Sequence, residues 1–300
     1  MYIFQGDSIT EVFYNGIEVL LHEGQKWQTI KGKVRELMPA LINIRHAGNK
    51  LLVVPERHSN IAASIAEFLW TMAGREDIAF MERYLPRCKN FSEDGVTWKG
   101  AYGPRIFSYE GINQLQKLLE RMKRNRYTRE GIIELYNPML DSATEANSPG
   151  TPCTNVLQFS ITKQNKLDLY VTMRSNDIVW GFTGPNYFLL SSMQEIIAYW
   201  LNAEVGEYHQ FVCSLDLFER HFRQVEEMLE NRGSDIYKIY DKNDLKPDFT
   251  YEEMNDILSK FFEIEKDFDD IERFNVNCNK LENLGSKYIM NLAYVLNYII

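Results

Sequence analysis

The sequence predicts an α+β (α/β) protein in which one large mixed β-sheet is covered by helices. Segments of β type alternate along the chain with amphipathic helical segments, as this class requires. Two strong strand patterns at 155–161 and 167–174 are separated only by a polar turn, so we expect them to pair as a hairpin. With 300 residues the chain can bury a large core and needs no metal or disulfide to fold.

The helices expected near the start of the chain have their own start and stop signals. Ser8 can cap a helix that Gly24 ends, and Asn60 can cap a second helix that Gly74 stops. Further strands are expected at 37–45, 50–55, 131–136 and 208–213, and further helices at 111–125, 188–201 and 216–231.

Two loops and a C-terminal extension complete the expected organisation. The glycine-containing stretch 91–103 and the polar stretch 141–149 are predicted to be loops. We expect a core over residues 1–222 and an acidic helical extension over residues 223–300 that packs on it.

The composition excludes several classes of protein. The chain has 33 Lys and Arg against 42 Asp and Glu, a net charge of -9, which argues against general nucleic-acid binding. It has no apolar run of about 18 residues that would span a membrane, and its start lacks the basic region of a signal peptide. The cysteines show no CxxC pair or His/Cys cluster, so we expect no metal, no disulfide and a cytoplasmic location. These cysteines are Cys88, Cys153, Cys213 and Cys278.

Reactive residue types occur together near the predicted hairpin. Cys153 stands at the mouth of one strand, and Arg174 ends the other, where a guanidinium would favour the nucleophilic thiolate. Arg174 with Ser175 suits a phosphate dianion, while Asp177 and Asn186 suit the edge of a heterocyclic base. The simpler alternatives are a buried structural thiol and an ordinary polar strand end.

These segments resemble the thymidylate synthase superfamily, whose five motifs occur here in the family's order over roughly residues 8–222. The motifs are Pro152-Cys153, Arg174-Ser175-Asn176-Asp177, Gly181 to Asn186, Glu67-Phe68-Leu69-Trp70 and Tyr102-Gly103. The sequence around these motifs most resembles the nucleotide hydroxymethylase branch, which acts on CMP, dCMP or dUMP. The resemblance implies a thymidylate-synthase-like fold, a homodimer, and 5,10-methylenetetrahydrofolate as co-substrate for transfer of a one-carbon unit to C5 of a pyrimidine nucleoside 5′-monophosphate.

The resemblance also implies a role for each matching residue. The implied roles are nucleophile for Cys153, proton relay for Glu67, help in removing the C5 proton for Tyr102, contact with the pterin ring for Asp177, recognition of the base edge for Asn186, and binding of the 5′-phosphate for Arg174 and Ser175. Glu67 lies among apolar neighbours on its helix, so we expect its carboxyl group to be partly desolvated.

The chain departs from the family at the phosphate and the sugar. Lys31 replaces an arginine of the N-terminal phosphate loop, and Arg129 keeps one of two arginines that a partner subunit donates, with Glu130 in the second position. Asp216 and Phe218 replace the His-x-Tyr pair that binds the sugar hydroxyl. An Asp can accept from two hydroxyls, which favours a ribose; the alternative is that sugar recognition has decayed.

The remaining departures concern the base and the product. Asn186 modestly favours uracil over cytosine, and Thr154 follows the nucleophile where thymidylate synthases commonly have His. The acidic extension replaces the closing C-terminal tail, so water could reach the intermediate and give a hydroxymethyl product. Reductive methylation of dUMP, a non-catalytic nucleotide-binding regulator and a scaffold that uses the extension remain as alternatives.

Overall fold

The computed structural model describes residues 1–142, 150–232 and 246–299, which contain one mixed β-sheet of eight strands. The strands are β1 (Tyr2–Gly6), β2 (Gln25–Thr29), β3 (Gly32–Leu37), β4 (Ala40–Ile44), β5 (Ile132–Glu134), β6 (Thr154–Ile161), β7 (Lys166–Asp177) and β8 (Glu204–Phe218). The main order is β1-β4-β8-β7-β6-β5, and the long strand β8 also pairs with β3, which carries β2. The predicted mixed sheet is confirmed.

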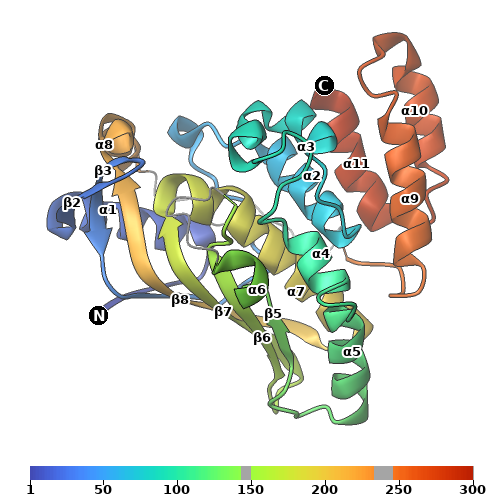
Figure 1. The fold of residues 1–300 in the computed structure, drawn as a ribbon, viewed down its shortest axis with the longest axis horizontal. Helices are drawn as coiled ribbons and strands as arrows, with labels where there is room; N and C mark the ends of the chain where they lie inside the picture. Colours follow the sequence, from blue (N-terminus) through green and yellow to red (C-terminus); the bar gives the residue numbers. More distant parts are fainter. Residues whose placement is uncertain (143–149, 233–245, 300) are drawn as a thin grey trace.

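The helices lie on one side of this sheet (Figure 1). They are α1 (Ile9–Glu23), α2 (Ile61–Met72), α3 (Ile78–Tyr84), α4 (Tyr102–Phe107), α5 (Gln114–Arg124), α6 (Pro138–Asp141), α7 (Tyr187–Trp200), α8 (Phe222–Glu230), α9 (Met254–Glu265), α10 (Phe274–Leu281) and α11 (Lys287–Ile299). Helices α1 and α7 pack directly on the sheet, and α2 packs on α7 as the next layer.

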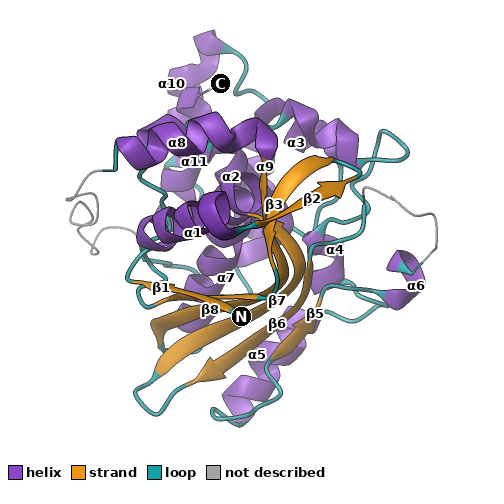
Figure 2. Cartoon of the chain, turned by 90° about the vertical axis from the view of Figure 1, so that its left-hand side faces the viewer, coloured by secondary structure: helices purple, strands orange, loops and turns teal. Residues whose placement is uncertain are grey.

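The opposite face of the sheet carries no helix within the described ranges (Figure 2). Successive strand residues alternate between the two faces, so Leu169 and Val171 are buried under the helices while Tyr170 is 42% exposed. Phe211 on the neighbouring strand is 37% exposed, and Cys213 is exposed as well. This open face therefore presents apolar side chains to the solvent.

Local capping explains why two predicted helices form where expected. The Ser8 hydroxyl accepts the Glu11 N–H at 3.2 Å, and the Asn60 side chain accepts the Ala63 N–H at 2.9 Å. Each bond satisfies one of the N–H groups that the first helical turn leaves without a partner. At the end of α2, Gly74 has a φ of +70°, a conformation that glycine adopts without steric cost.

Two sequence predictions of secondary structure are wrong. The helix expected at 216–231 begins only at Phe222, because Asp216 and its neighbours extend β8 and pair with β3. The strand expected at 50–55 does not form: the Val53 N–H donates to the Thr10 hydroxyl at 3.1 Å, and a short 3-10 turn follows. Tertiary pairing overrides local preference in both cases. The loop expected at 141–149 lies mostly outside the described residues.

The C-terminal helices are anchored to the rest of the protein by partly buried polar contacts. Lys50 forms an ion pair with Glu195 on α7, and the Tyr288 hydroxyl of α11 donates to the same carboxylate at 2.8 Å. Arg83 of α3 pairs with Glu265 of α9 at 2.6 Å. The apolar core is continuous across this junction. None of the described helices is long and apolar enough to cross a lipid bilayer.

Candidate active site

Cys153 lies just before β6 and is held by the neighbouring strand β7. Its carbonyl accepts the backbone N–H of Arg174 at 2.9 Å, and its half-buried Sγ lies 4.0 Å from the Ser175 hydroxyl. The Arg174 guanidinium donates to the carbonyls of Pro152 and Thr151, each at 3.0 Å. Arg174 therefore fixes the turn that presents the thiol, and the predicted neighbourhood of Cys153, Arg174 and Ser175 is present.

Glu67 and Tyr102 lie in the same buried region as Cys153. Glu67, on α2, is 8% exposed, and its Oε2 atom has no hydrogen-bond partner among the described residues. Burial raises the pKa of Glu67 to about 7. Burial also raises the pKa of Tyr102, and the negative charges of Cys153 and Glu67 raise it further. The Tyr102 hydroxyl donates to Thr154, the residue after Cys153, at 2.8 Å, and α4 packs on α2, so the three residues lie near one another. A carboxyl group that titrates near neutral pH suits an acid or base in catalysis.

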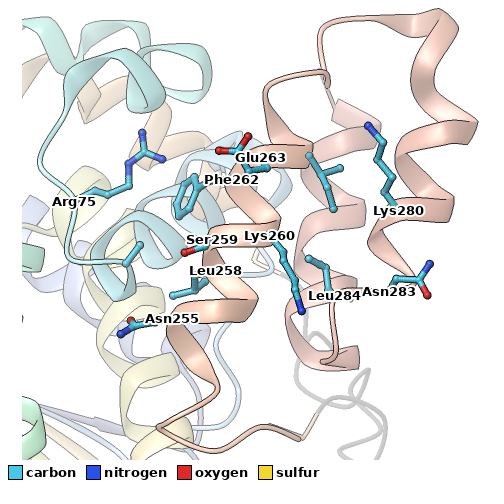
Figure 3. A pocket seen from close by; sticks show the side chains of 12 residues that line it. Arg75, Asn255, Leu258, Ser259, Lys260, Phe262, Glu263, Lys280, Asn283 and Leu284 are labelled. Carbon is cyan, nitrogen blue, oxygen red and sulfur yellow. The ribbon is translucent and has the colours of Figure 1, made fainter.

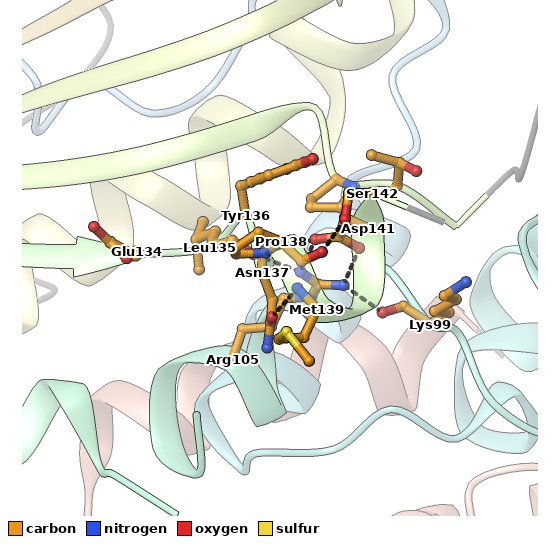
Figure 4. Close-up of polar contacts among 12 residues, drawn as sticks. Lys99, Arg105, Glu134, Leu135, Tyr136, Asn137, Pro138, Met139, Asp141 and Ser142 are labelled. Atoms are coloured by element: carbon orange, nitrogen blue, oxygen red, sulfur yellow. Dashed lines mark hydrogen bonds and ion pairs between the residues drawn. The ribbon is translucent and has the colours of Figure 1, made fainter. Parts of the chain in front are cut away.

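A buried ion pair fixes the short helix that carries Tyr102. Arg105, one turn after Tyr102 on α4, binds both oxygens of Asp141 at 2.6 and 2.8 Å (Figure 4). The same guanidinium donates to the carbonyls of Leu135 and Lys99 at 2.6 and 3.0 Å. The pair ties α4 to α6 and β5, so the position of the Tyr102 phenol depends on contacts far along the chain.

Asn186 is oriented by a second, buried asparagine. Its Nδ2 atom donates to Oδ1 of Asn176 at 3.2 Å, and Asn176 is only 3% exposed. Gly181 lies against this pair, since a Cβ atom there would come within 2.3 Å of the Asn176 oxygen. The glycine therefore makes room for the amide pair, as a base-recognition loop would require.

Three carboxyl groups face one another across adjacent strands. Asp177 on β7 lies opposite Asp216 on β8, which in turn lies opposite Glu36 on β3. Burial, followed by the charges of Asp177 and Glu36, raises the pKa of Asp216 to about 7, while Lys31 opposes the shift. Oδ1 of Asp216 is buried without a hydrogen-bond partner among the described residues. This part of the site can bind a hydroxyl group.

Three arginines that no sequence motif predicts gather around Asp177 and Trp180. Burial lowers the pKa of both Arg57 and Arg87 to about 10, against the opposing charge of Asp177. Their guanidinium carbons lie 5.5 and 3.1 Å from the centre of the Trp180 ring. Arg220 approaches Asp177 at 3.8 Å. The arginines are too far apart in the sequence to form a motif, and they meet at the loop after Asp177, whose carboxylate accepts the N–H groups of Val179 and Trp180 at 2.9 and 3.0 Å.

Two predicted phosphate ligands, Lys31 and Arg129, do not belong to the arginine cluster around Trp180. Lys31 is exposed in the turn between β2 and β3. Arg129 is exposed near β5, where its carbonyl accepts from Gln158 at 3.2 Å. Glu130 forms an exposed ion pair with Arg121 at 3.5 Å, which partly offsets its charge. Within one copy of the chain, Arg129 is therefore not brought to Cys153.

A groove of about 970 Å³ opens between the end of α2 and helices α9 and α10 (Figure 3). None of the residues that line it belongs to the predicted site. Its cations already have acidic partners: Arg75 pairs with Asp77 at 2.7 Å and Lys260 with Asp256 at 2.6 Å. The groove is a feature of the junction with the C-terminal helices. In the described ranges, no group of three or more His, Cys, Asp and Glu residues could hold a metal ion.

Comparison with known proteins decides the family. The model of the thymidylate synthase family matches residues 11–267, which is most of the chain. This chain belongs to the thymidylate synthase family. Members of the family use methylenetetrahydrofolate as a co-substrate, so the chain is an enzyme that transfers one-carbon units.

Individual relatives fall in two groups within the thymidylate synthase family. The deoxyuridylate hydroxymethyltransferase of Bacillus phage SP01 is 29% identical over 296 residues, covering 88% of this chain and 74% of the phage protein. The protein of the same name from Delftia phage PhiW-14 is 28% identical over 254 residues, covering 82% and 69%. The thymidylate synthase of Francisella philomiragia is 28% identical over 220 residues, covering 67% and 78%.

Proposed function

We propose that this enzyme hydroxymethylates deoxyuridylate at C5 of the uracil ring, with methylenetetrahydrofolate as the one-carbon donor. The observation that carries the proposal is that Tyr102, bonded to Thr154 beside Cys153, lies near the buried carboxyl group of Glu67, whose Oε2 atom has no hydrogen-bond partner among the described residues. A protein that only bound a nucleotide would gain nothing from a thiol and a neutral-pH acid close together. The names of the two phage relatives support the choice of substrate and product.

The proposed reaction uses Cys153 as the nucleophile. Its thiolate adds to C6, and the electron pair of the C5=C6 bond makes C5 nucleophilic toward the one-carbon unit that methylenetetrahydrofolate supplies. Tyr102 and Glu67 assist removal of the C5 proton, which leaves an exocyclic methylene on the base when the folate is released. Water adds its hydroxyl there, and the thiolate leaves C6. The two protons, from C5 and from water, end on the two folate nitrogens that held the methylene.

The net reaction converts dUMP, methylenetetrahydrofolate and water into 5-hydroxymethyl-dUMP and tetrahydrofolate. No hydride is transferred. In thymidylate-type methylation, by contrast, a hydride from the folate reduces the methylene and leaves dihydrofolate. The thymidylate synthase of Francisella philomiragia is a relative of comparable identity, so reductive methylation of dUMP is the second candidate function.

We assign binding roles to the residues around the thiol. Arg174 and Ser175 bind the 5′-phosphate with help from Lys31, and Asn186 reads the base edge from its contact with Asn176. Asp216 receives the sugar. The names of the phage relatives support a deoxyribose, and a ribose, which the carboxylate alone would favour, is the alternative.

Asp177, with Arg57 and Arg87 around Trp180, supplies the folate subsite in this proposal. An aromatic face suits the fused pterin ring, the positive charge suits the carboxylates of the folate's glutamate tail, and the Asp177 carboxyl can bond to ring nitrogens.

We further propose that the enzyme is a homodimer built through the open face of the sheet. The exposed side chains of Tyr170 and Phe211 would be buried there, which favours association. Arg129 lies outside its own site, so it could reach the phosphate in a second copy.

Product analysis by mass spectrometry tests the proposed function. The enzyme should convert dUMP with methylenetetrahydrofolate to a product about 30 mass units heavier, as expected when the cofactor's one-carbon unit and water add CH₂O to the base. UMP, CMP and dCMP are tested as alternative substrates in parallel assays. Cys153→Ser should give no product, because a hydroxyl is far less ionised than a thiol near neutral pH. Equal turnover by the Cys153→Ser variant and the wild-type enzyme would contradict covalent catalysis by this residue.

A further inference from the structure

Thr154, the residue after the nucleophile, has an environment that its position in a strand does not explain. It is fully buried, although Val156, Gln158 and Ser160, which share its parity along β6, are only partly buried. In a regular strand these four side chains would lie on one face. The residues that face the helices are Leu157, Phe159 and Ile161, and Thr154 faces the helices with them.

A β-bulge at Asn155 accounts for this reversal. Val156 lies opposite Thr172, but Thr154 lies opposite Met173, so the register shifts by one residue between them. Without the shift Thr154 would lie opposite the exposed Arg174. The carbonyl of Asn155 accepts the N–H groups of both Leu135 and Tyr136, at 2.8 and 3.2 Å. Bulges of this kind re-aim side chains beside active sites.

The re-aimed hydroxyl meets the Tyr102 phenol. Tyr102 donates to Oγ1 of Thr154 at 2.8 Å, and the Thr154 N–H approaches the phenol oxygen at 3.4 Å. No other hydrogen bond fixes the Tyr102 side chain among the described residues. One residue thus contacts the phenol through both its side chain and its backbone, immediately beside the thiol of Cys153.

We propose that Thr154 is a positioning residue that acts through Tyr102: its hydroxyl accepts the hydrogen bond of the phenol and so turns a free lone pair of the phenol oxygen toward C5 of the bound pyrimidine. The inference rests on the proposed function, because it assigns Thr154 to the step that removes the C5 proton. It predicts that the hydroxyl matters for the rate of this step and not for nucleotide binding.

The test compares Thr154→Val, which keeps the shape of the side chain, with Thr154→Ser, which keeps the hydroxyl. Thr154→Val should lower kcat about 10-fold to 100-fold with KM for dUMP within about twofold, since a misplaced group costs rate and not binding. The tritium isotope effect at C5 should rise, because proton removal becomes slower. Thr154→Ser should restore kcat to within about threefold of wild type.

A double-mutant cycle with Tyr102→Phe separates positioning from packing. If Thr154 acts through the phenol, Tyr102→Phe/Thr154→Val should be no slower than Tyr102→Phe alone. The role of Thr154 would be overturned if the double variant lost the product of the two single rate losses, or if Thr154→Val kept the wild-type kcat and isotope effect. In either case, activity of the wild-type enzyme would still support the proposed function. A wild-type enzyme inactive on every nucleotide offered would contradict the proposed function and this inference together.

Discussion

The buried carboxyl group of Glu67 destabilises the folded protein when it is charged, but its raised pKa suits acid–base catalysis. Its side chain is 8% exposed and its pKa is raised from 4.5 to about 7 by burial. The pKa of Glu67 is higher in the folded than in the unfolded protein, so at low pH, where the carboxyl is neutral in both states, it does not lower the free energy of unfolding. Its destabilising effect on the folded state grows as pH rises from about 4.5 to about 7.

We therefore predict opposite effects of Glu67→Gln on stability and on activity. Between pH 5 and pH 8 the unfolding free energy of the variant should gain about 2–3 kcal/mol relative to wild type. Activity should fall at least about 100-fold, because the amide cannot exchange a proton. Urea unfolding at several pH values measures the first effect. A stability difference that does not change with pH would show that Glu67 titrates normally.

Asp216 gives a second prediction at the residue scale. If its carboxyl group binds the sugar, Asp216→Asn should raise KM for the nucleotide about 10-fold while kcat changes little. Glu219→Gln, at an exposed carboxylate nearby on the chain, is the matched control. Wild-type kcat/KM for dUMP and UMP decides between the sugars. An unchanged KM in Asp216→Asn would place sugar recognition elsewhere.

Residues that carry a local motif could be predicted from the sequence, while residues that depend on tertiary register could not. Cys153 and Arg174 can be predicted because the hairpin that joins them is local. The pattern around Asp216 predicts a helix, since nothing in its own segment shows that β3 lies beside it. The inward turn of Thr154 depends on a one-residue shift against β7, and the approach of Arg87 to Trp180 depends on a loop far along the chain.

At the scale of elements, α4 depends on the Arg105–Asp141 pair. Both side chains are almost fully buried, at 4% and 0% exposure. Removing one partner of a buried pair typically costs about 3–5 kcal/mol, because the remaining charge stays buried. Asp141→Asn should destabilise the protein by roughly that amount and lower kcat through the displacement of Tyr102.

The exposed pair Lys117–Glu120, at 2.9 Å, supplies the control for this prediction. Glu120→Gln should change stability by less than about 0.5 kcal/mol, since exposed ion pairs contribute little. Equal stability of the two variants in urea would show that α4 is held by its apolar contacts alone.

The C-terminal helices act as an added layer in our interpretation. We propose a catalytic core over residues 1–222 and an extension over residues 223–300, joined by the partly buried contacts of Tyr288 with the Lys50–Glu195 pair and of Arg83 with Glu265. The sequence pattern predicted helices here. Their partners could not be predicted, because the Lys50–Tyr288 and Arg83–Glu265 contacts each join residues more than a hundred positions apart.

For the whole molecule, subunit complementation tests the proposed dimer. Arg129→Ala and Cys153→Ser should each be nearly inactive, but a mixture that exchanges subunits should recover up to about a quarter of wild-type activity. In a mixed dimer, one site combines an intact Cys153 with an intact Arg129. No recovery after verified subunit exchange would mean that Arg129 does not serve a neighbouring site.

The open face of the sheet gives the matching structural prediction. Phe211→Glu should convert the dimer to a monomer, since a charge would be buried at the interface. Light scattering measures the mass of the protein in solution. Tyr199→Glu, at a side chain 46% exposed on the helical side, should leave the dimer intact. A monomeric wild-type protein with full activity would contradict this arrangement.

The most direct test of the central claim follows both products in one assay. During turnover of dUMP with methylenetetrahydrofolate, hydroxymethylation yields tetrahydrofolate, and reductive methylation yields dihydrofolate, which changes the ultraviolet absorbance. We predict 5-hydroxymethyl-dUMP by mass spectrometry, with an equal amount of tetrahydrofolate and no rise in dihydrofolate. Dihydrofolate that accumulates in step with a 5-methyl product would contradict the claim and show that the site excludes water and transfers a hydride.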